Sequence, residues 1–406
     1  MRIRKKYLFY VLALLSSFIG AAVTVIDTYI SVKYEFNPWS LCLAIFIAGL
    51  VITFLLCILL SIPFKGKSIG TRIDPSFKRL RLLRKQEIKF HLVAGLGNAV
   101  ATVAYFFIIS IYKEPSTTLA FFEVVILYLL LMESIAEKNA PTMAEVQASI
   151  VVTFGAIMAS FSFQGEINLL GLLIVFLILN PAWVVFSIYQ RKLKIMRING
   201  CYNDAINIRF WNLIFTTFFT SILVYFINKE NFFDALNILK YWHLFFISMG
   251  ITFFSYILYI RALGLGKASV TQAVKAFTII FAIPFTIFLS SFVPISFYES
   301  IPQFILKIMG IILVIMGVIS FALTEVRAYI FIKAKTGYPI NDLLNAIWHI
   351  KGITSVAVVA GNYDLIAKAR MRTLGKGYER IIRNLEKVKG IEYFGWETIL
   401  KEWEEV

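Results

Sequence analysis

The sequence predicts an all-α polytopic membrane protein with a small C-terminal α+β domain, and three observations support this fold class. Hydrophobic residues make up 59% of the 406 residues and charged residues only 16%, against about one half and one quarter in ordinary globular domains. The chain also contains ten apolar runs of roughly the 20 residues that a helix needs to cross a bilayer. After residue 325 the sequence changes to short, charged, amphipathic segments. This composition excludes disorder, a disulfide scaffold and a soluble enzyme over most of the length.

The ten apolar runs predict ten transmembrane helices. The first follows a basic start, and we interpret it as a spanning helix because its apolar stretch is too long for the h-region of a signal peptide. Pro181 lacks a backbone donor and predicts a kink within the sixth run. The runs cover residues 7–32, 39–62, 89–111, 116–136, 145–163, 168–190, 207–228, 241–262, 268–292 and 302–323.

The distribution of basic residues predicts the orientation. The start of the chain and the loops on the same predicted side of the membrane carry 20 Lys and Arg, and the opposite loops carry four. Because cytoplasmic loops hold the excess of positive charge, a multi-pass protein of the cell membrane with both termini in the cytoplasm is predicted. The basic segment 72–89 is expected to be a solvated loop, and an amphipathic helix lying on anionic lipid is the alternative. Nucleic acid is not an expected partner.

The ten runs divide into two halves of five, residues 1–163 and 164–325. Glu137 precedes Gly155 by 18 residues, and Glu299 precedes Gly317 by the same 18 residues. Because five is odd, the second half enters the membrane from the opposite side, so the repeats are inverted. Inverted repeats are the architecture of many secondary transporters. Chance similarity between apolar helices is the alternative.

These features resemble the drug/metabolite transporter superfamily, and more narrowly its EamA-type members, over residues 7–323. The first half departs from the pattern, since Leu131 lies near the position equivalent to Pro284. The resemblance implies ten helices around a central cavity that takes a small-molecule solute. The residues that carry it in the second half are Gly264–Ser269, Pro284, Glu299, Gly310 and Gly317.

Polar residues recur on one face of the first, third, fourth, sixth, eighth and ninth predicted helices. Glu123 and Lys275 take positions one residue apart when the fourth and ninth helices are aligned, which places them on facing walls near the midplane. Charges at this depth indicate a functional site. We expect Lys275 to bind an anionic group such as a carboxylate, and Glu123 to bind an amine or a coupling proton. The candidate substrate-binding residues are Glu123, Lys275, Gln272, Asn98, Asn180 and Asp27.

Several of these polar residues have a structural alternative. Glu123 and Lys275 can instead form an ion pair that joins the two halves. Ser and Thr hydroxyls can satisfy their own helix backbone or join neighbouring helices. Asp27 lies near the outer end of its run and can be interfacial. The charged residues near helix ends are expected to snorkel towards water; they are Glu133, Arg209 and Lys307.

Residues 326–406 are predicted to form a ferredoxin-like βαββαβ domain. The pattern gives strands at 328–334, 353–360, 364–370 and 391–399 and helices at 340–350 and 374–387. A turn at 361–363 is a hairpin signal.

Segments 351–356, 359–365 and 388–392 resemble the ligand-binding (RAM) domain of Lrp/AsnC-type regulators. The resemblance implies an amino-acid effector held by Gly361, Tyr363 and Asp364, and a homodimer formed through 326–406. The alternative is that the turn only closes the hairpin. No helix-turn-helix precedes this domain, so DNA binding is not implied.

Together these features predict a secondary transporter, acting as an exporter by alternating access, for a small organic solute such as an amino acid or a related metabolite. The cytosolic domain is expected to sense an amino acid and regulate transport. A membrane-tethered amino-acid sensor without transport is the alternative. The sequence contains no HExxH motif, nucleophile elbow, phosphate loop or clustered His and Cys ligands, so no enzyme activity, metal or cofactor is predicted.

Overall fold

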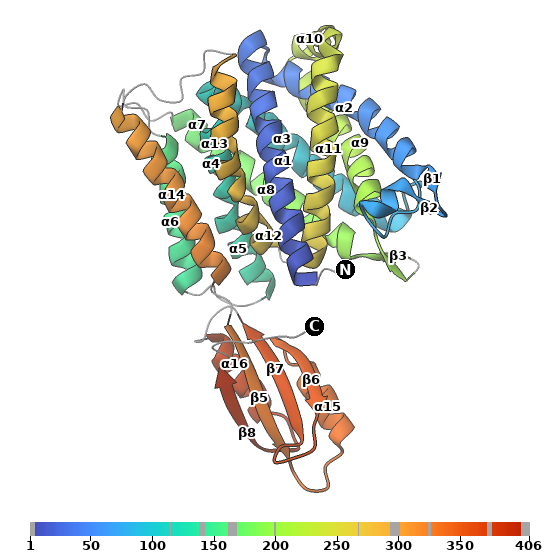
Figure 1. Cartoon of the computed structure of the whole chain (residues 1–406), viewed down its shortest axis with the longest axis vertical. Helices are drawn as coiled ribbons and strands as arrows, with labels where there is room; N and C mark the ends of the chain where they lie inside the picture. Colours follow the sequence, from blue (N-terminus) through green and yellow to red (C-terminus); the bar gives the residue numbers. More distant parts are fainter. Residues whose placement is uncertain are drawn as a thin grey trace. The chain divides into compact units, whose positions relative to one another are not determined.

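The computed structural model describes residues 5–113, 115–137, 143–160, 169–198, 200–266, 268–292, 301–323, 326–371 and 376–398. The chain forms two compact units (Figure 1). The helical unit comprises Met1–Asn139 and Ala148–Ile319, and the C-terminal unit comprises Ala140–Gln147 and Ser320–Val406.

The membrane part of the chain is built almost entirely of helices. Their bounds are α1 (Lys5–Tyr34), α2 (Pro38–Ser61), α3 (Lys85–Tyr112), α4 (Pro115–Glu123), α5 (Val125–Glu137), α6 (Met143–Ser160), α7 (Leu169–Ile174), the π-helix η2 (Val175–Leu179), α8 (Asn180–Ile195), α9 (Ala205–Ile227), α10 (Lys229–Ile238), the 3-10 turn η3 (Leu239–Tyr241), α11 (Trp242–Leu265), α12 (Ala268–Lys275), α13 (Phe277–Ser290) and α14 (Ile301–Leu323).

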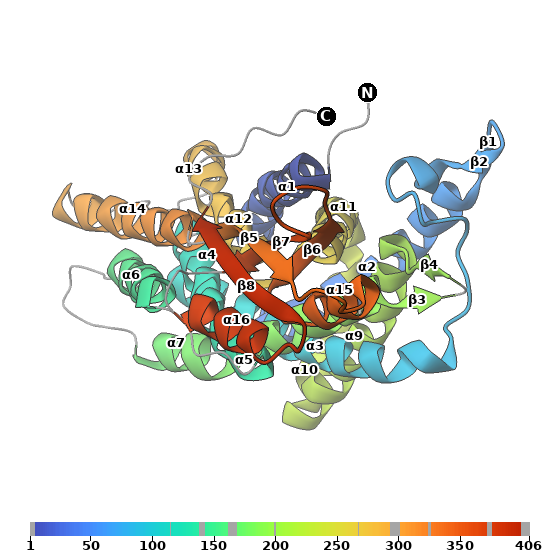
Figure 2. The same ribbon diagram turned by 90° about the horizontal axis from the view of Figure 1, so that it is seen from below.

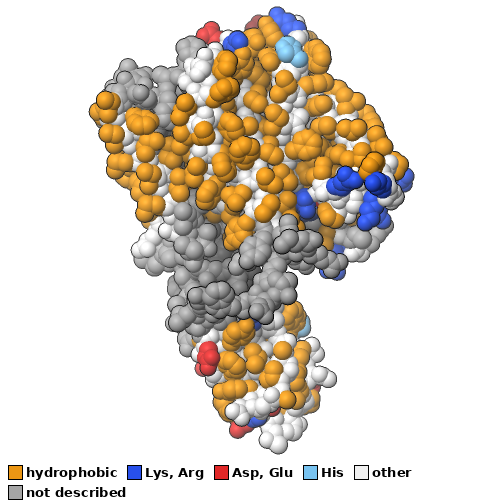
Figure 3. Space-filling model, in the orientation of Figure 1, with side chains coloured by type: hydrophobic (Ala, Val, Ile, Leu, Met, Phe, Trp, Pro, Cys, Tyr) orange, Lys and Arg blue, Asp and Glu red, His pale blue; other side chains and the backbone are white. Residues whose placement is uncertain are grey.

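Within the described residues, seven helical segments are long and apolar enough to cross a membrane. They are Leu8–Tyr34, Pro38–Ser61, Lys85–Tyr112, Leu169–Ile195, Ala205–Ile227, Lys229–Leu265 and Ala268–Ser290. The other three predicted runs coincide with α4–α5, α6 and α14, so the count of ten crossings is not reached by this measure. Hydrophobic side chains cover most of the face of the helical unit shown in Figure 3. Large side chains such as Phe218 and Phe288 are more than half exposed there or elsewhere, which suits lipid as the surrounding solvent. The protein is a multi-span membrane protein.

Three of the helical segments are irregular in their middle. Val124 separates α4 from α5, and Ala276 separates α12 from α13. At each break the next backbone bond spans three residues instead of four, to Val124 from Leu127 (3.1 Å) and to Ala276 from Ile279 (3.0 Å). The π-helix η2 directly precedes Asn180 and Pro181, which fits the irregularity predicted there because proline cannot donate to the preceding turn.

Helices distant in the sequence pack in pairs across the helical unit. α1 packs along α11, α8 along α3, and α2 along α9. The α1–α11 pair is joined by two reciprocal hydrogen bonds, from the Ser16 hydroxyl to the Ser255 carbonyl (2.9 Å) and from the Ser255 hydroxyl to the Ser16 carbonyl (3.1 Å). In the α3–α8 pair Gly97 allows close approach, because an added Cβ would lie 2.9 Å from the Ala182 carbonyl oxygen.

The basic segment before α3 is not an amphipathic helix. After the hairpin of β1 (Pro63–Phe64) and β2 (Lys67–Ser68) and the 3-10 turn η1 (Ile69–Arg72), it runs without helix to Arg84 (Figure 2). Its apolar side chains enter the protein: Phe77 is fully buried in a cluster with residues of α8, α9 and α11. The lipid-bound helix considered above is therefore wrong. The solvated loop holds only for the outer side chains, such as Lys78 and Arg79.

A polar network fastens this segment to three helix ends. Arg81 donates two hydrogen bonds of 2.7 Å to the carboxylate of Glu87 on α3 and one of 2.9 Å to Asn203. The Lys194 ammonium on α8 contacts Asp74 at 2.7 Å. Although burial favours the neutral carboxyl, the Lys194 charge and the hydrogen bonds that Asp74 accepts hold its pKa below the ordinary value.

The C-terminal unit has the predicted βαββαβ succession. It runs β5 (Val326–Ala334), α15 (Ile340–Trp348), β6 (Ile353–Val358), β7 (Leu365–Met371), α16 (Lys376–Glu386) and β8 (Ile391–Thr398). The four strands form an antiparallel sheet in the order β6-β7-β5-β8. Alternate strand residues pack against both helices in one hydrophobic core, which includes Ile330, Ala367, Leu343 and Leu385.

Candidate functional site

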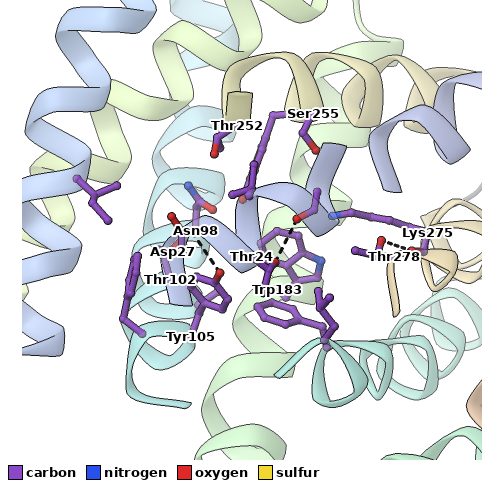
Figure 4. A pocket seen from close by; sticks show the side chains of 18 of the residues that line it. Thr24, Asp27, Asn98, Thr102, Tyr105, Trp183, Thr252, Ser255, Lys275 and Thr278 are labelled. Carbon is purple, nitrogen blue, oxygen red and sulfur yellow. Dashed lines mark hydrogen bonds between the residues drawn. The ribbon is translucent and has the colours of Figure 1, made fainter. Parts of the chain in front are cut away.

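A cavity of about 890 Å³ lies among the helices of the helical unit. Residues of α1, α2, α3, α4, α8, α9, α11, α12 and α13 line it. In Figure 4 Lys275 extends into the cavity from one side, while Asp27, Asn98 and Tyr105 gather on another. The polar and charged lining residues are Thr24, Asp27, Asn98, Thr102, Glu123, Arg209, Thr252, Ser255, Gln272, Lys275 and Thr278. The six helices whose polar faces the sequence marked therefore meet at one place.

Asp27 is a buried member of this wall. It is 6% exposed, and both carboxylate oxygens accept hydrogen bonds: Oδ1 from the Ser248 hydroxyl at 2.6 Å and Oδ2 from the Tyr105 hydroxyl at 3.2 Å. These contacts contradict the alternative of an interfacial, water-facing side chain. Two hydroxyl donors stabilise the carboxylate without a cation beside it.

Glu123 and Lys275 line the same cavity, each as the last residue of a broken helix. Glu123 is 2% exposed, and its Oε2 has no hydrogen-bond partner among the described residues. The Lys275 ammonium lies over the rings of Trp183 and Tyr259, 5.1 and 4.7 Å from their centroids. None of the ion pairs formed by described residues within 4.0 Å joins these two side chains. The structure therefore brings the two charges to one cavity without the direct ion pair that was the structural alternative.

The three candidate amides have different roles. Asn98 lines the cavity, and its Nδ2 donates to Thr216 at 3.0 Å while Oδ1 has no partner in the described part of the chain. Gln272 also lines the cavity, and its Oε1 lies 3.5 Å from the Tyr259 hydroxyl. Asn180 is not a lining residue. Its Nδ2 donates to the carbonyl oxygens of Phe121 (3.1 Å) and Val175 (2.9 Å), so it braces the π-helix against α4.

Arg209 is the site residue that the sequence analysis missed. It lines the cavity, is 1% exposed, and stacks its guanidinium over Tyr256 at 4.1 Å. The prediction that it snorkels to water is wrong. A signal was present, because the buried polar residues of α9 recur at helical spacing. They are Arg209, Asn212, Thr216 and Thr220.

Some of the predicted polar stripe is structural. The Ser17 hydroxyl donates to the Ala13 carbonyl (2.9 Å) and the Thr24 hydroxyl to the Gly20 carbonyl (3.2 Å), four residues earlier in each case. These residues satisfy their own helix, as the alternative proposed. Across the segments that the structure describes, no three His, Cys, Asp or Glu side chains come together as metal ligands.

The candidate effector residues lie around the β6–β7 turn of the C-terminal unit. Gly361 has φ +146°, a conformation that glycine adopts without strain. Tyr363 packs against Phe331, with 5.2 Å between ring centroids. The Asp364 carboxylate accepts the Ala334 backbone N–H at 2.8 Å. That hydrogen bond holds the pKa of Asp364 below its ordinary value, and the Lys333 ammonium at 3.3 Å adds to the effect. Asp364 thus already serves the sheet, as the structural alternative for this turn requires.

Comparison with known proteins gives no family. No family model and no curated protein matches the chain. One matching solved structure, described only as the crystal structure of a protein, is 13% identical, with 76% of this chain and 98% of the other covered and a TM-score of 0.44. A likeness at this level carries no argument about function. The fold and cavity define a multi-span membrane protein with a C-terminal β-sheet domain.

Proposed function

We propose that this protein is a secondary transporter that exports a small organic solute, an amino acid or a related metabolite, by alternating access. The observation that carries the proposal is the buried cavity whose charged residues lie at the breaks of two helices. Broken helices with charged or polar groups at mid-membrane form the substrate sites of many secondary transporters. A charge at that depth is costly, so its retention favours a role in binding. The positive-inside distribution supports a protein of the cell membrane with both termini in the cytoplasm.

The packing supports two inverted halves of five helices, residues 1–163 and 164–325, as in the drug/metabolite transporters that the sequence resembles. If the sixth to tenth helices repeat the first to fifth, the contact of α1 with α11 corresponds to that of α8 with α3, and both occur. The fourth and ninth helices are also broken one residue after Glu123 and Lys275, respectively.

The crossing of α6 and α14 supports the same relation. A Cβ on Gly155 would lie 2.6 Å from the Gly310 carbonyl oxygen, and one on Gly317 would lie 2.8 Å from the Ala148 carbonyl oxygen. Gly155 and Gly317 each follow their loop glutamate by 18 residues, and Ala148 and Gly310 each follow it by 11. Each half therefore offers the same two positions to the other, which is the contact pattern of a two-fold axis.

For the C-terminal unit we propose an amino-acid-sensing domain of the RAM type that pairs with a second copy and regulates export. The βαββαβ order and the glycine at the β6–β7 turn support this. The helices cover one face of the sheet, and the other presents adjoining aromatic rings. These rings belong to Tyr329, Phe331, Tyr363 and Tyr393. A sheet face of this composition suits a homodimer interface.

Flux measurements in proteoliposomes test the proposal. The full chain should export or exchange a labelled solute down its gradient, and Glu123→Gln with Lys275→Gln should abolish the flux while leaving the folded protein intact. A chain truncated before residue 326 should lose the response to effector but keep flux. If the full chain binds amino acids at residues 326–406 and moves none of the solutes offered, the protein is the membrane-tethered sensor instead.

A further inference from the structure

The cavity contains two acidic and two basic side chains that do not neutralise one another directly. Asp27 and Glu123 are the acids, and Arg209 and Lys275 are the bases. No ion pair within 4.0 Å that the described residues form involves any of the four. Buried charges are normally paired. The four charges sum to zero when all are ionised, so a solute with a net charge would leave the site unbalanced.

Arg209 is the unfilled donor of the cavity. Its guanidinium is stacked on Tyr256, but Nε and Nη1 have no hydrogen-bond partner in the part of the chain that the structure describes. A guanidinium presents its N–H groups as a planar fork that matches the two oxygens of a carboxylate. Lys275 differs, because its ammonium is already held over two aromatic rings.

Glu123 is the unfilled acceptor. Its Oε2 is buried and has no partner among the described residues, whereas both oxygens of Asp27 already accept hydroxyl donors. A carboxylate oxygen in this state suits an ammonium group. The remainder of the wall is largely apolar and aromatic, from residues such as Phe106, Phe122 and Met249.

We propose that the cavity binds a zwitterionic amino acid with an apolar side chain, its carboxylate on Nε and Nη1 of Arg209 and its ammonium on Oε2 of Glu123. This inference rests on the proposed transport function and assigns the solute class of the same site. It also moves the anion-binding role from Lys275, where the sequence placed it, to Arg209.

Binding to the purified full chain tests the inference independently of transport. The proteinogenic amino acids are screened by thermal shift in detergent, since a ligand of the folded state stabilises it. The best apolar binder is then compared with its decarboxylated amine and its deaminated acid. The zwitterion should bind roughly a hundredfold more tightly than either analogue, because each analogue leaves one buried charge unpaired. Failure of every amino acid to bind would overturn the proposal.

Charge-removing variants assign the two poles. Arg209→Gln should lose the preference for the zwitterion over the amine, and Glu123→Gln should lose the preference over the deaminated acid. Arg197→Gln and Glu230→Gln remove the same charges from exposed positions and should bind as wild type. Arg209→Lys keeps the charge without the fork, and should bind with roughly tenfold lower affinity. It provides a second assessment if Arg209→Gln does not fold.

The outcomes separate this inference from the transport proposal. Amino-acid binding with the expected variant pattern but no flux overturns transport and supports the assigned site. Flux whose solute preference is unchanged in Arg209→Gln and Glu123→Gln supports transport and overturns the assigned poles.

Discussion

The crossing of α6 and α14 allows a precise test of the packing. In Gly155→Ala the new methyl group would lie 2.6 Å from the Gly310 carbonyl oxygen and 2.8 Å from the Val314 backbone nitrogen. Both are backbone atoms of the facing helix, so no side-chain rotation can relieve the clash. The two helices must separate, and their contacts weaken together.

The size of the effect follows from two opposing contributions. Overpacking of this kind costs about 1–3 kcal/mol, while replacing Gly by Ala within a helix gains up to about 1 kcal/mol. Gly250→Ala on α11 is the matched control, because the nearest atom to its new Cβ is Ile52 Cγ1 at 4.0 Å. The helix contribution is common to both variants, so their difference isolates the steric cost of about 1–3 kcal/mol.

The assay is unfolding of the full chain in detergent, with each variant compared at one protein concentration. Gly155→Ala should be less stable than wild type or equal to it, and Gly250→Ala should be at least as stable as wild type. Gly317→Ala should match Gly155→Ala, since its Cβ would lie 2.8 Å from the Ala148 carbonyl oxygen. Equal stability of Gly155→Ala and Gly250→Ala would refute the close crossing, and unequal effects at the two crossing glycines would refute its two-fold character.

Three further predictions concern charged groups. Asp74→Asn leaves Lys194 buried without its carboxylate, so the free energy of unfolding should fall by about 3 kcal/mol, and Asp74→Leu with Lys194→Met should recover most of the loss; an unchanged unfolding midpoint for Asp74→Asn would contradict the network. Asp364 has a lowered pKa, so its stabilising effect should be full at neutral pH and lost as the pH falls through the folded pKa, below the ordinary value of 3.8; hydrogen exchange in β5 should therefore differ between wild type and Asp364→Asn at neutral pH and converge in acid. Glu123→Leu with Lys275→Leu should fold but lose solute binding, and retained binding would show that the two charges serve only the structure.

The regular elements could be predicted closely from the sequence, because long apolar runs and strand alternation are strong signals. All ten apolar runs lie on helices, and the elements of the C-terminal unit begin and end within a few residues of the prediction. The break at Val124 could not be predicted. No Gly or Pro marks it, so tertiary contacts decide it.

Two errors share a physical cause, which is that a sequence pattern does not name the partner of a side chain. The apolar residues of segment 72–89 suit a lipid surface as well as a protein core, and Phe77 turns out to be buried in the protein. Arg209 lies four residues from the start of α9, where a cation usually reaches water. The stripe of polar residues that continues from it to Thr220 was the stronger signal, because snorkelling explains one residue and not a helix face.

The opposite charges at the two helix breaks give direction to a cavity between similar halves. Lys275 ends α12, and the C-terminal end of a helix favours a cation. Glu123 ends α4 but directly precedes the N-terminal end of α5, which favours an anion. Each break thus stabilises the charge that it carries. Two identical halves would present the same charge at both breaks and could not distinguish the ends of a solute. The exchange of one acid for one base lets the site bind a dipolar solute in a single orientation, which a zwitterion requires and a simple anion or cation does not.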